Sequence, residues 1–182
     1  NKNWMKVHEQ EMDSNLFEDI ENLKPVIQPG TSDSAALDNV FELLNISGQP
    51  APLAKLMLVP DAWSKKSKVL SKDHQQLFNF LNSTMEPWDG PAAIAGTDNE
   101  WVIAANDRNG LRPLRYTITK DKFLFAGSET GMIKLNEKKI LAKGRLGPGE
   151  IIGVRIEKGK LFTNEKIKNY LAKEYKHFNG QI

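Results

Sequence analysis

The sequence has no cysteine among its 182 residues. This absence excludes disulfide bonds, thiolate metal sites and a cysteine nucleophile within the chain. Histidine is scarce too: His8, His74 and His177 lie far apart, and none has a partner at the spacing of metal ligands. We therefore expect surface or packing roles for all three histidines and predict no metal site.

Long apolar runs are missing as well, and so is a large excess of charge of one sign. No apolar run approaches the roughly 18 residues that a membrane span needs. The formal net charge of +2 is too small to indicate binding to nucleic acid or to a membrane surface. Lysines do gather in the stretch 64–72 ("SKKSKVLSK"), which we interpret as a solvent-exposed face, with a phosphate-binding patch as the alternative.

The first half of the chain is predicted to be helical. Its clearest signal is a stripe of apolar residues at the spacing i, i+3, i+4 and i+7, formed by Leu37, Val40, Phe41 and Leu44. Apolar patterns also predict one or two helices within 4–20, a short helix over about 52–59 and another over 72–85.

The second half of the chain has a strand pattern. Three pairs of short apolar runs are joined by the tight turns "TDNE", "TKDK" and "EKGK", and each pair predicts a hairpin. An amphipathic helix follows in "EKIKNYLAKEY". We therefore predict an α+β fold over 1–182, mainly helical over 1–85, with antiparallel strands and hairpins over 86–163 and a C-terminal helix over 164–182.

Asp33 is the candidate site residue. It lies in "TSDS", just before the apolar stripe, where a carboxylate can cap free amides and suits the positive end of the helix dipole. The neighbouring Ser32 or Thr31 could supply that cap instead. Asp33 would then be available to bind a cationic group of a substrate, and the residues alone leave both roles open.

The stretch "DRNGLRP" (107–113) is predicted to be a turn that ends a strand. We expect Gly110 to have a positive φ and Arg108 or Arg112 to form a local ion pair, with a catalytic arginine as the alternative. In "EPWDGP" we expect Trp88 to have a packing role.

Six motifs occur in a fixed order along the chain: "TSDSAALDNVFELL", "VPDAW", "MEPWDGPAAIA", "DRNGLRPLRY", "GSETGM" and "KGRLGPGEI". Together they resemble the class II glutamine amidotransferase (glutaminase) domain in the large subunit of glutamate synthases, and the resemblance covers almost the whole chain. It implies an N-terminal-nucleophile hydrolase fold, a layered sandwich in which two antiparallel sheets pack between helices. It also implies that Asp33 binds the α-ammonium group of glutamine.

The sequence departs from that family at the nucleophile. Enzymes of this class are expected to attack the glutamine amide with an N-terminal cysteine, and an arginine and an oxyanion hole complete the site. This chain begins at Asn1 and has no cysteine, so it resembles the C-terminal portion of the domain, incomplete at the N-terminus. We expect no catalytic residue in this chain and no activity from the chain alone.

For the parent protein, the resemblance implies a glutamate synthase that supplies ammonia for the reductive amination of 2-oxoglutarate to glutamate. FMN, an iron–sulfur cluster and an electron donor (NADPH, NADH or ferredoxin) would be bound by other domains, and this segment would bind no cofactor. Glutamine would be the substrate, and the remaining domains of the large subunit would be partners, with a small subunit left open. The expected location is the cytoplasm, or a plastid in a plant or alga.

Two alternatives to this function remain open at this point. The chain could be a non-catalytic remnant or interaction fragment that lacks the nucleophile. It could also belong to the glutaminase domain of another amidotransferase, such as the purine-pathway enzyme.

Overall fold

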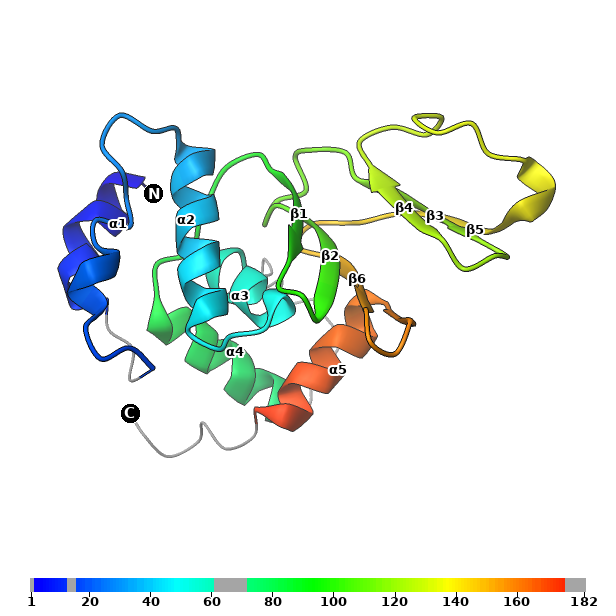
Figure 1. Cartoon of the computed structure of the whole chain (residues 1–182). Coiled ribbons are helices and arrows are strands. Elements are labelled where there is room, and N and C mark those ends of the chain that lie inside the picture. The colour runs from blue at the N-terminus through cyan, green and yellow to red at the C-terminus, as the bar shows by residue number, and fades with distance from the viewer. Residues whose placement is uncertain (1, 13–15, 61–71, 176–182) are drawn as a thin grey trace.

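The computed structural model describes residues 2–12, 16–60 and 72–175 and has an α+β architecture with two antiparallel sheets (Figure 1). The α+β prediction is therefore confirmed. Most of the lysine-rich stretch 64–72 and the last residues of the predicted C-terminal helix lie outside the described residues. No helix in the described residues is both long enough and apolar enough to cross a membrane.

Five α-helices and three short 3-10 helices are present in the described residues. The α-helices are α1 (Lys2–His8), α2 (Asp33–Ile46), α3 (Ala51–Leu58), α4 (Lys72–Thr84) and α5 (Asn164–Glu174), and the 3-10 helices are η1 (Glu9–Glu11), η2 (Ile20–Leu23) and η3 (Glu137–Lys139). The N-terminal segment contains less regular helix than expected. Val7 and Leu16 are 73% and 67% exposed, so its apolar residues do not share one buried face.

The predicted stripe of α2 faces the core. Val40 is fully buried and Leu44 is nearly so, while Leu37 and Phe41 pack at the edge of the same core. Helix α3 is buried along its entire length because seven of its eight residues are apolar, and its single charged residue, Lys55, is only 1% exposed. These two helices lie against one face of the larger sheet together with α5, which packs on β6 and β7 (Figure 1).

The larger sheet, sheet A, has the strand order β1-β2-β6-β7. Its strands are β1 (Ala93–Thr97), β2 (Trp101–Asn106), β6 (Ile151–Arg155) and β7 (Lys160–Phe162), and all neighbours are antiparallel. The hairpins predicted at "TDNE" and "EKGK" are confirmed. Asp98 stabilises the first turn, because its Oδ1 accepts hydrogen bonds from the amides of Glu100 (2.9 Å) and Trp101 (2.6 Å).

The smaller sheet, sheet B, has the strand order β4-β3-β5. It consists of β3 (Arg115–Thr119), β4 (Leu124–Gly127) and β5 (Ile140–Arg145). The hairpin at "TKDK" is confirmed, but β5 was not predicted. This strand pairs with β3 after a long connection instead of a tight turn, and five of its six residues are small, charged or exposed, so it has no clear apolar alternation.

The main core lies between the helices and one face of sheet A. Trp101 is at its centre, 1% exposed, with its ring 4.9 Å from the ring of Phe162 and 5.7 Å from that of Tyr170 on α5. A second, smaller core joins the two sheets and contains Ala104, Leu114, Leu146 and Ile152. No α-helix lies against sheet B in the described part of the chain, so the second helical layer implied by the resemblance is not seen there (Figure 1).

Candidate substrate-binding site

A tight loop leads into α2 and sets the position of its first turn. Gly30 has a φ of +77°, and the Thr31 hydroxyl donates a hydrogen bond to the Gln28 carbonyl at 2.8 Å. The ammonium group of Lys2 donates to the Thr31 carbonyl and so ties the loop to α1. The hydrogen bond within the loop and the one from Lys2 therefore fix the position of the start of α2.

Ser32, and not Asp33, caps α2. The Ser32 hydroxyl accepts a hydrogen bond from the Ala35 amide at 3.2 Å and bonds the Ser34 hydroxyl at 3.0 Å. The Asp33 side chain is exposed and has no hydrogen bond or ion pair to any residue in the described part of the chain. Its carboxylate at the positive end of the helix dipole is therefore available to a ligand.

A second structured loop, "DRNGLRP", is organised by the buried side chain of Asp107. The carboxylate accepts hydrogen bonds from the amides of Ala92 (3.3 Å), Asn109 (3.0 Å), Leu111 (3.0 Å) and Arg112 (3.1 Å). Burial raises the pKa of Asp107, but these four backbone donors outweigh it and leave the pKa below its ordinary value. The loop is therefore built around an ionised carboxylate.

Of two sequence predictions for this loop, one is confirmed and one is wrong. Gly110 has a φ of +65°, as predicted. Neither Arg108 nor Arg112 forms an ion pair with any described residue, so the expected local pair is wrong. The reason is that backbone amides already occupy both oxygens of Asp107, the adjacent carboxylate.

Lys55, which was not singled out from the sequence, joins α3 to the turn "LGPGE". Its ammonium group donates a hydrogen bond to the Gly149 carbonyl at 2.7 Å. The Gly149 amide in turn donates to the Asp107 carbonyl at 2.8 Å. The only sequence signal was a single lysine inside the apolar run "PLAKLMLVP", where burial requires a polar partner.

The structure brings the Asp107 loop and the "LGPGE" turn together but does not bring Asp33 to either. No hydrogen bond or ion pair joins Asp33 to those two turns within residues 2–12, 16–60 and 72–175. Trp88 is 8% exposed and lies in the main core, which confirms its packing role.

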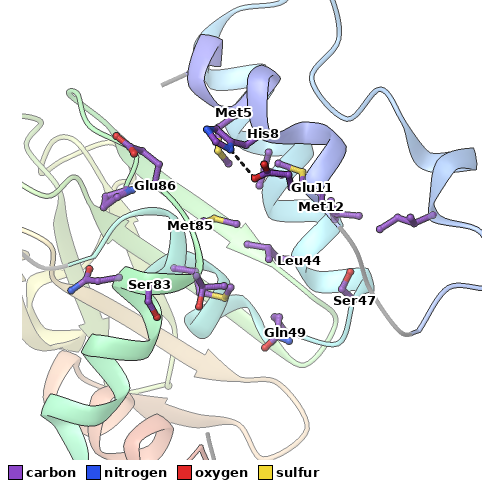
Figure 2. Close-up of a pocket in the computed structure, with 17 residues that line it drawn as sticks. Met5, His8, Glu11, Met12, Leu44, Ser47, Gln49, Ser83, Met85 and Glu86 are labelled. Carbon is purple, nitrogen blue, oxygen red and sulfur yellow. Dashed lines mark hydrogen bonds and ion pairs between the residues drawn. The ribbon is translucent and has the colours of Figure 1, made fainter. Parts of the chain in front are cut away.

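A cavity of about 800 Å³ lies between α1, α2, α3 and the end of α4 (Figure 2). Methionines form much of its wall, and His8 Nδ1 lies 2.8 Å from Glu11 Oε2 at one side. Asp33 is not among its lining residues. The described residues contain no cluster of three His, Asp or Glu side chains that could hold a metal ion, in this cavity or elsewhere.

Comparison with known proteins gives one family and several relatives. The family model "Glutamine amidotransferases class-II" matches residues 1–179. The chain is 51% identical over 173 residues to "Glutamate synthase [NADPH] large chain" of Azospirillum brasilense, covering 94% of this chain and 11% of that protein.

Two further relatives carry other electron donors in their names. The chain is 42% identical over 175 residues to "Glutamate synthase [NADH]" of Saccharomyces cerevisiae, covering 95% of this chain and 8% of the relative. It is 38% identical over 175 residues to "Ferredoxin-dependent glutamate synthase 2, chloroplastic" of Arabidopsis thaliana, and the match covers 94% of this chain and 11% of that relative. The chain thus spans about a tenth of the length of the relatives that it matches.

Proposed function

The chain belongs to the class II glutamine amidotransferase family, and from this premise we propose that it forms the glutamine-binding part of a glutamate synthase amidotransferase domain. Within that domain, Asp33 binds the α-ammonium group of glutamine. The domain has the layered N-terminal-nucleophile hydrolase fold, and the ammonia that it releases is used for the reductive amination of 2-oxoglutarate to glutamate.

The state of the Asp33 carboxylate is the observation that carries this proposal. A carboxylate that serves as a helix cap has an oxygen engaged with backbone amides, but here the Ser32 hydroxyl performs that task. The exposed Asp33 carboxylate therefore keeps both oxygens for hydrogen bonds to an ammonium group. A charge-assisted pair of this kind is among the stronger hydrogen bonds in proteins.

The nucleophile is assigned to a segment outside these 182 residues. The chain has no cysteine, and the chemistry of this class needs a thiolate to attack the amide carbon. FMN, the iron–sulfur cluster and the electron-donor site also belong to other domains in this proposal. Relatives of this chain are named for NADPH, NADH and ferredoxin. The proposed location is the cytoplasm, or a plastid in a plant or alga.

The test compares the 182-residue chain with a full-length chimera. In the chimera, this chain replaces the matched 173 residues of the Azospirillum brasilense large chain. We expect the chimera to release ammonia from glutamine and the isolated chain to release none above the uncatalysed rate. Turnover by the isolated, cysteine-free chain would contradict the assignment of the nucleophile to another segment.

A chimera that folds but does not hydrolyse glutamine would favour the alternative, a non-catalytic interaction fragment. The lack of a cysteine is the observation that keeps this alternative in view. Circular dichroism and size-exclusion chromatography of the chimera establish whether it is folded, so the two results can be told apart.

A further inference from the structure

Glu9, in the short helix η1, has a buried carboxylate to which the proposed function gives no role. The residue is only 8% exposed. Its Oε1 accepts a hydrogen bond from the Ile27 amide at 2.9 Å, across 18 positions of the chain. Burial of a carboxylate costs free energy, so a buried glutamate is normally found where its hydrogen bond is needed. Here the bond holds the backbone at Ile27.

Residues 25–31 lie between η2 and α2, and we call this segment the entry loop. Its Val26 and Ile27 are 7% and 1% exposed, so this part of the loop is packed into the main core. Asn39, in the second turn of α2, donates from Nδ2 to the Val26 carbonyl at 2.8 Å. The contacts from Glu9 and Asn39 therefore fix the first half of the entry loop between η1 and α2.

The second half of the entry loop is a turn closed by the Gln28 carbonyl. This carbonyl accepts hydrogen bonds from the Thr31 hydroxyl at 2.8 Å and from the Thr31 amide at 3.4 Å. The side-chain amide of Gln28 donates to the Pro25 carbonyl at 2.7 Å. Because these bonds join both ends of the loop to Gln28, a displacement of Ile27 also displaces Thr31.

Thr31 sets the position of Asp33 through the backbone. Ser32, which follows Thr31, caps the first turn of α2, and Asp33 is the first residue of that turn. The exposed Asp33 side chain makes no hydrogen bond or ion pair within the part of the chain that the structure describes. Its position relative to a ligand therefore depends on the entry loop. Lys2 also contacts the Thr31 carbonyl, but through a long side chain that is only partly buried.

We propose that Glu9 is a positioning residue for glutamine binding. Its bond to Ile27 holds the entry loop, and the loop holds the Asp33 carboxylate where the α-ammonium group of glutamine binds. This inference rests on the proposed function. A displacement of about 1 Å far from the reacting atoms can cost an enzyme roughly 100-fold, so a remote hydrogen bond can matter for substrate use. The partner of Glu9 is a backbone amide, so the role requires the reach of the side chain more than its charge.

Two substitutions of Glu9 separate reach from charge. Glu9→Asp keeps the charge but withdraws the acceptor by about 1.5 Å, one carbon–carbon bond, whereas Glu9→Gln keeps an oxygen within reach and removes the charge. In the chimera, we expect Glu9→Asp to raise KM for glutamine at least about fivefold, with kcat within about twofold. Glu9→Gln should leave both within about twofold. Equal losses in the two variants would overturn the proposal.

Glu11→Asp is the matched control for Glu9→Asp. Glu11 belongs to the same short helix, but its side chain is exposed and bonds His8 instead of the entry loop. We therefore expect KM to stay within about twofold, because no contact of the entry loop is lost. A rise in KM equal to that of Glu9→Asp would show that any shortened side chain in η1 has this effect, and would overturn the specific role of Glu9.

A double-mutant cycle tests whether Glu9 acts through Asp33. If it does, Glu9→Asp should raise KM by less than about twofold in a chimera that already carries Asp33→Asn, because the contact that it positions is gone. Effects that multiply would overturn the positioning role. So would a KM that Glu9→Asp leaves unchanged while Asp33→Asn raises it, and the proposed function would then still stand. A KM unchanged by Asp33→Asn would contradict the proposed function, and the positioning role with it.

Amide exchange in the 182-residue chain tests the entry loop without any measurement of activity. Glu9→Asp should speed exchange of the Ile27 and Thr31 amides at least about tenfold, and Glu9→Gln should not. Faster exchange at Ile27 alone would show that the loop does not transmit the displacement, and would overturn the proposal. Asn39→Ala removes the second contact of the loop and provides a test if Glu9→Asp does not fold. It should raise KM in the chimera at least about threefold, and an unchanged KM would overturn the role of the entry loop.

Discussion

At the residue scale, Ser32 caps α2 and so leaves the Asp33 carboxylate for the substrate role that we propose. The Ser32 hydroxyl satisfies the Ala35 amide at the start of α2. Asp33 follows it in the first turn with an exposed side chain. A helix start commonly places several short polar residues together, so composition alone does not identify the one that caps. The hydrogen bond between the Ala35 amide and the Ser32 hydroxyl identifies Ser32 as the cap.

Asp33→Asn in the chimera is expected to weaken glutamine use by roughly 10- to 150-fold, because a hydrogen bond to a charged group contributes about 1.5–3 kcal/mol. The ammonium group is bound in ground and transition states alike, so most of the loss should be a higher KM. Steady-state kinetics of ammonia release measure this. Glu42→Gln, on the exposed side of the same helix, is the control and should leave KM unchanged.

The outcome for Asp33→Asn separates binding from capping. Asparagine caps helices as well as aspartate does, and Ser32 is the cap here. We therefore expect an unchanged melting temperature. An unchanged KM would refute the substrate role, and a lowered melting temperature with normal kinetics would assign Asp33 to structure.

Asp107 gives a prediction about stability and pH. Asp107→Asn should lower the free energy of unfolding by about 2–6 kcal/mol, because the new amide group faces two backbone N–H donors and leaves them unsatisfied. Asp38→Asn on the exposed side of α2 is the matched control, with a change within about 0.5 kcal/mol. Urea unfolding of the isolated chain measures both.

The pH dependence of Asp107→Asn follows from the lowered pKa of Asp107. Because the pKa of the folded state lies below that of the unfolded state, the carboxylate stabilises the fold above a pH of about 4. That stabilisation is lost as the pH falls through the folded-state pKa. The difference between the native chain and the variant should therefore shrink in acid, and a constant difference between pH 7 and pH 3 would argue against this cause.

At the scale of helices and strands, an element could be predicted where the sequence around it carries a local signal. The three hairpins were predicted because a tight turn separates two apolar runs in each, and α2 because its stripe has helical spacing. Strand β5 has neither signal, since its partner β3 lies across a long connection. Lys55 was missed for a similar reason: its partner Gly149 lies 94 residues away.

The turn around Gly110 allows a direct test of how tightly the "DRNGLRP" and "LGPGE" stretches pack. Gly110→Ala should lower the free energy of unfolding by about 2–4 kcal/mol, because its φ is +65° and a Cβ would lie 3.1 Å from the Pro148 Cα. Gly159→Ala is the control: its φ is +53°, but nothing lies within 4 Å of its Cβ, so we expect only about 1 kcal/mol. Equal losses in denaturant unfolding would show that the contact with Pro148 is not significant.

At the scale of the whole molecule, two cores of unequal size hold the described residues together. The main core joins the five α-helices of the described residues to sheet A, while the second core has only four buried residues at the junction with sheet B. The resemblance implied a sandwich between helical layers. However, secondary-structure propensity and the pattern of apolar residues do not show which face of a sheet is left uncovered. The structure shows the uncovered faces, because side chains such as those of Val102 and Ala126 are exposed there.

Native-state hydrogen exchange of the isolated chain should reveal this inequality. We expect amides in β3, β4 and β5 to exchange through local opening at lower free energy than amides in β2 and β6, because few buried contacts hold sheet B. Amide-resolved exchange by NMR measures the two groups in one sample. A single free energy of opening for both sheets would show that they unfold as one unit.

The positions of Trp88 and Trp101 determine what the fluorescence of these two residues can detect. Both are buried in the main core, and neither belongs to the second core. Trp101 has two aromatic neighbours within 6 Å, so its emission is sensitive to the packing of α5 on sheet A. Light emitted by these two indoles therefore reports on the helical side of the molecule and carries no direct signal from sheet B. Loss of sheet B alone would leave the emission of these two residues unchanged, and Phe125→Trp would place an optical probe for that event in β4.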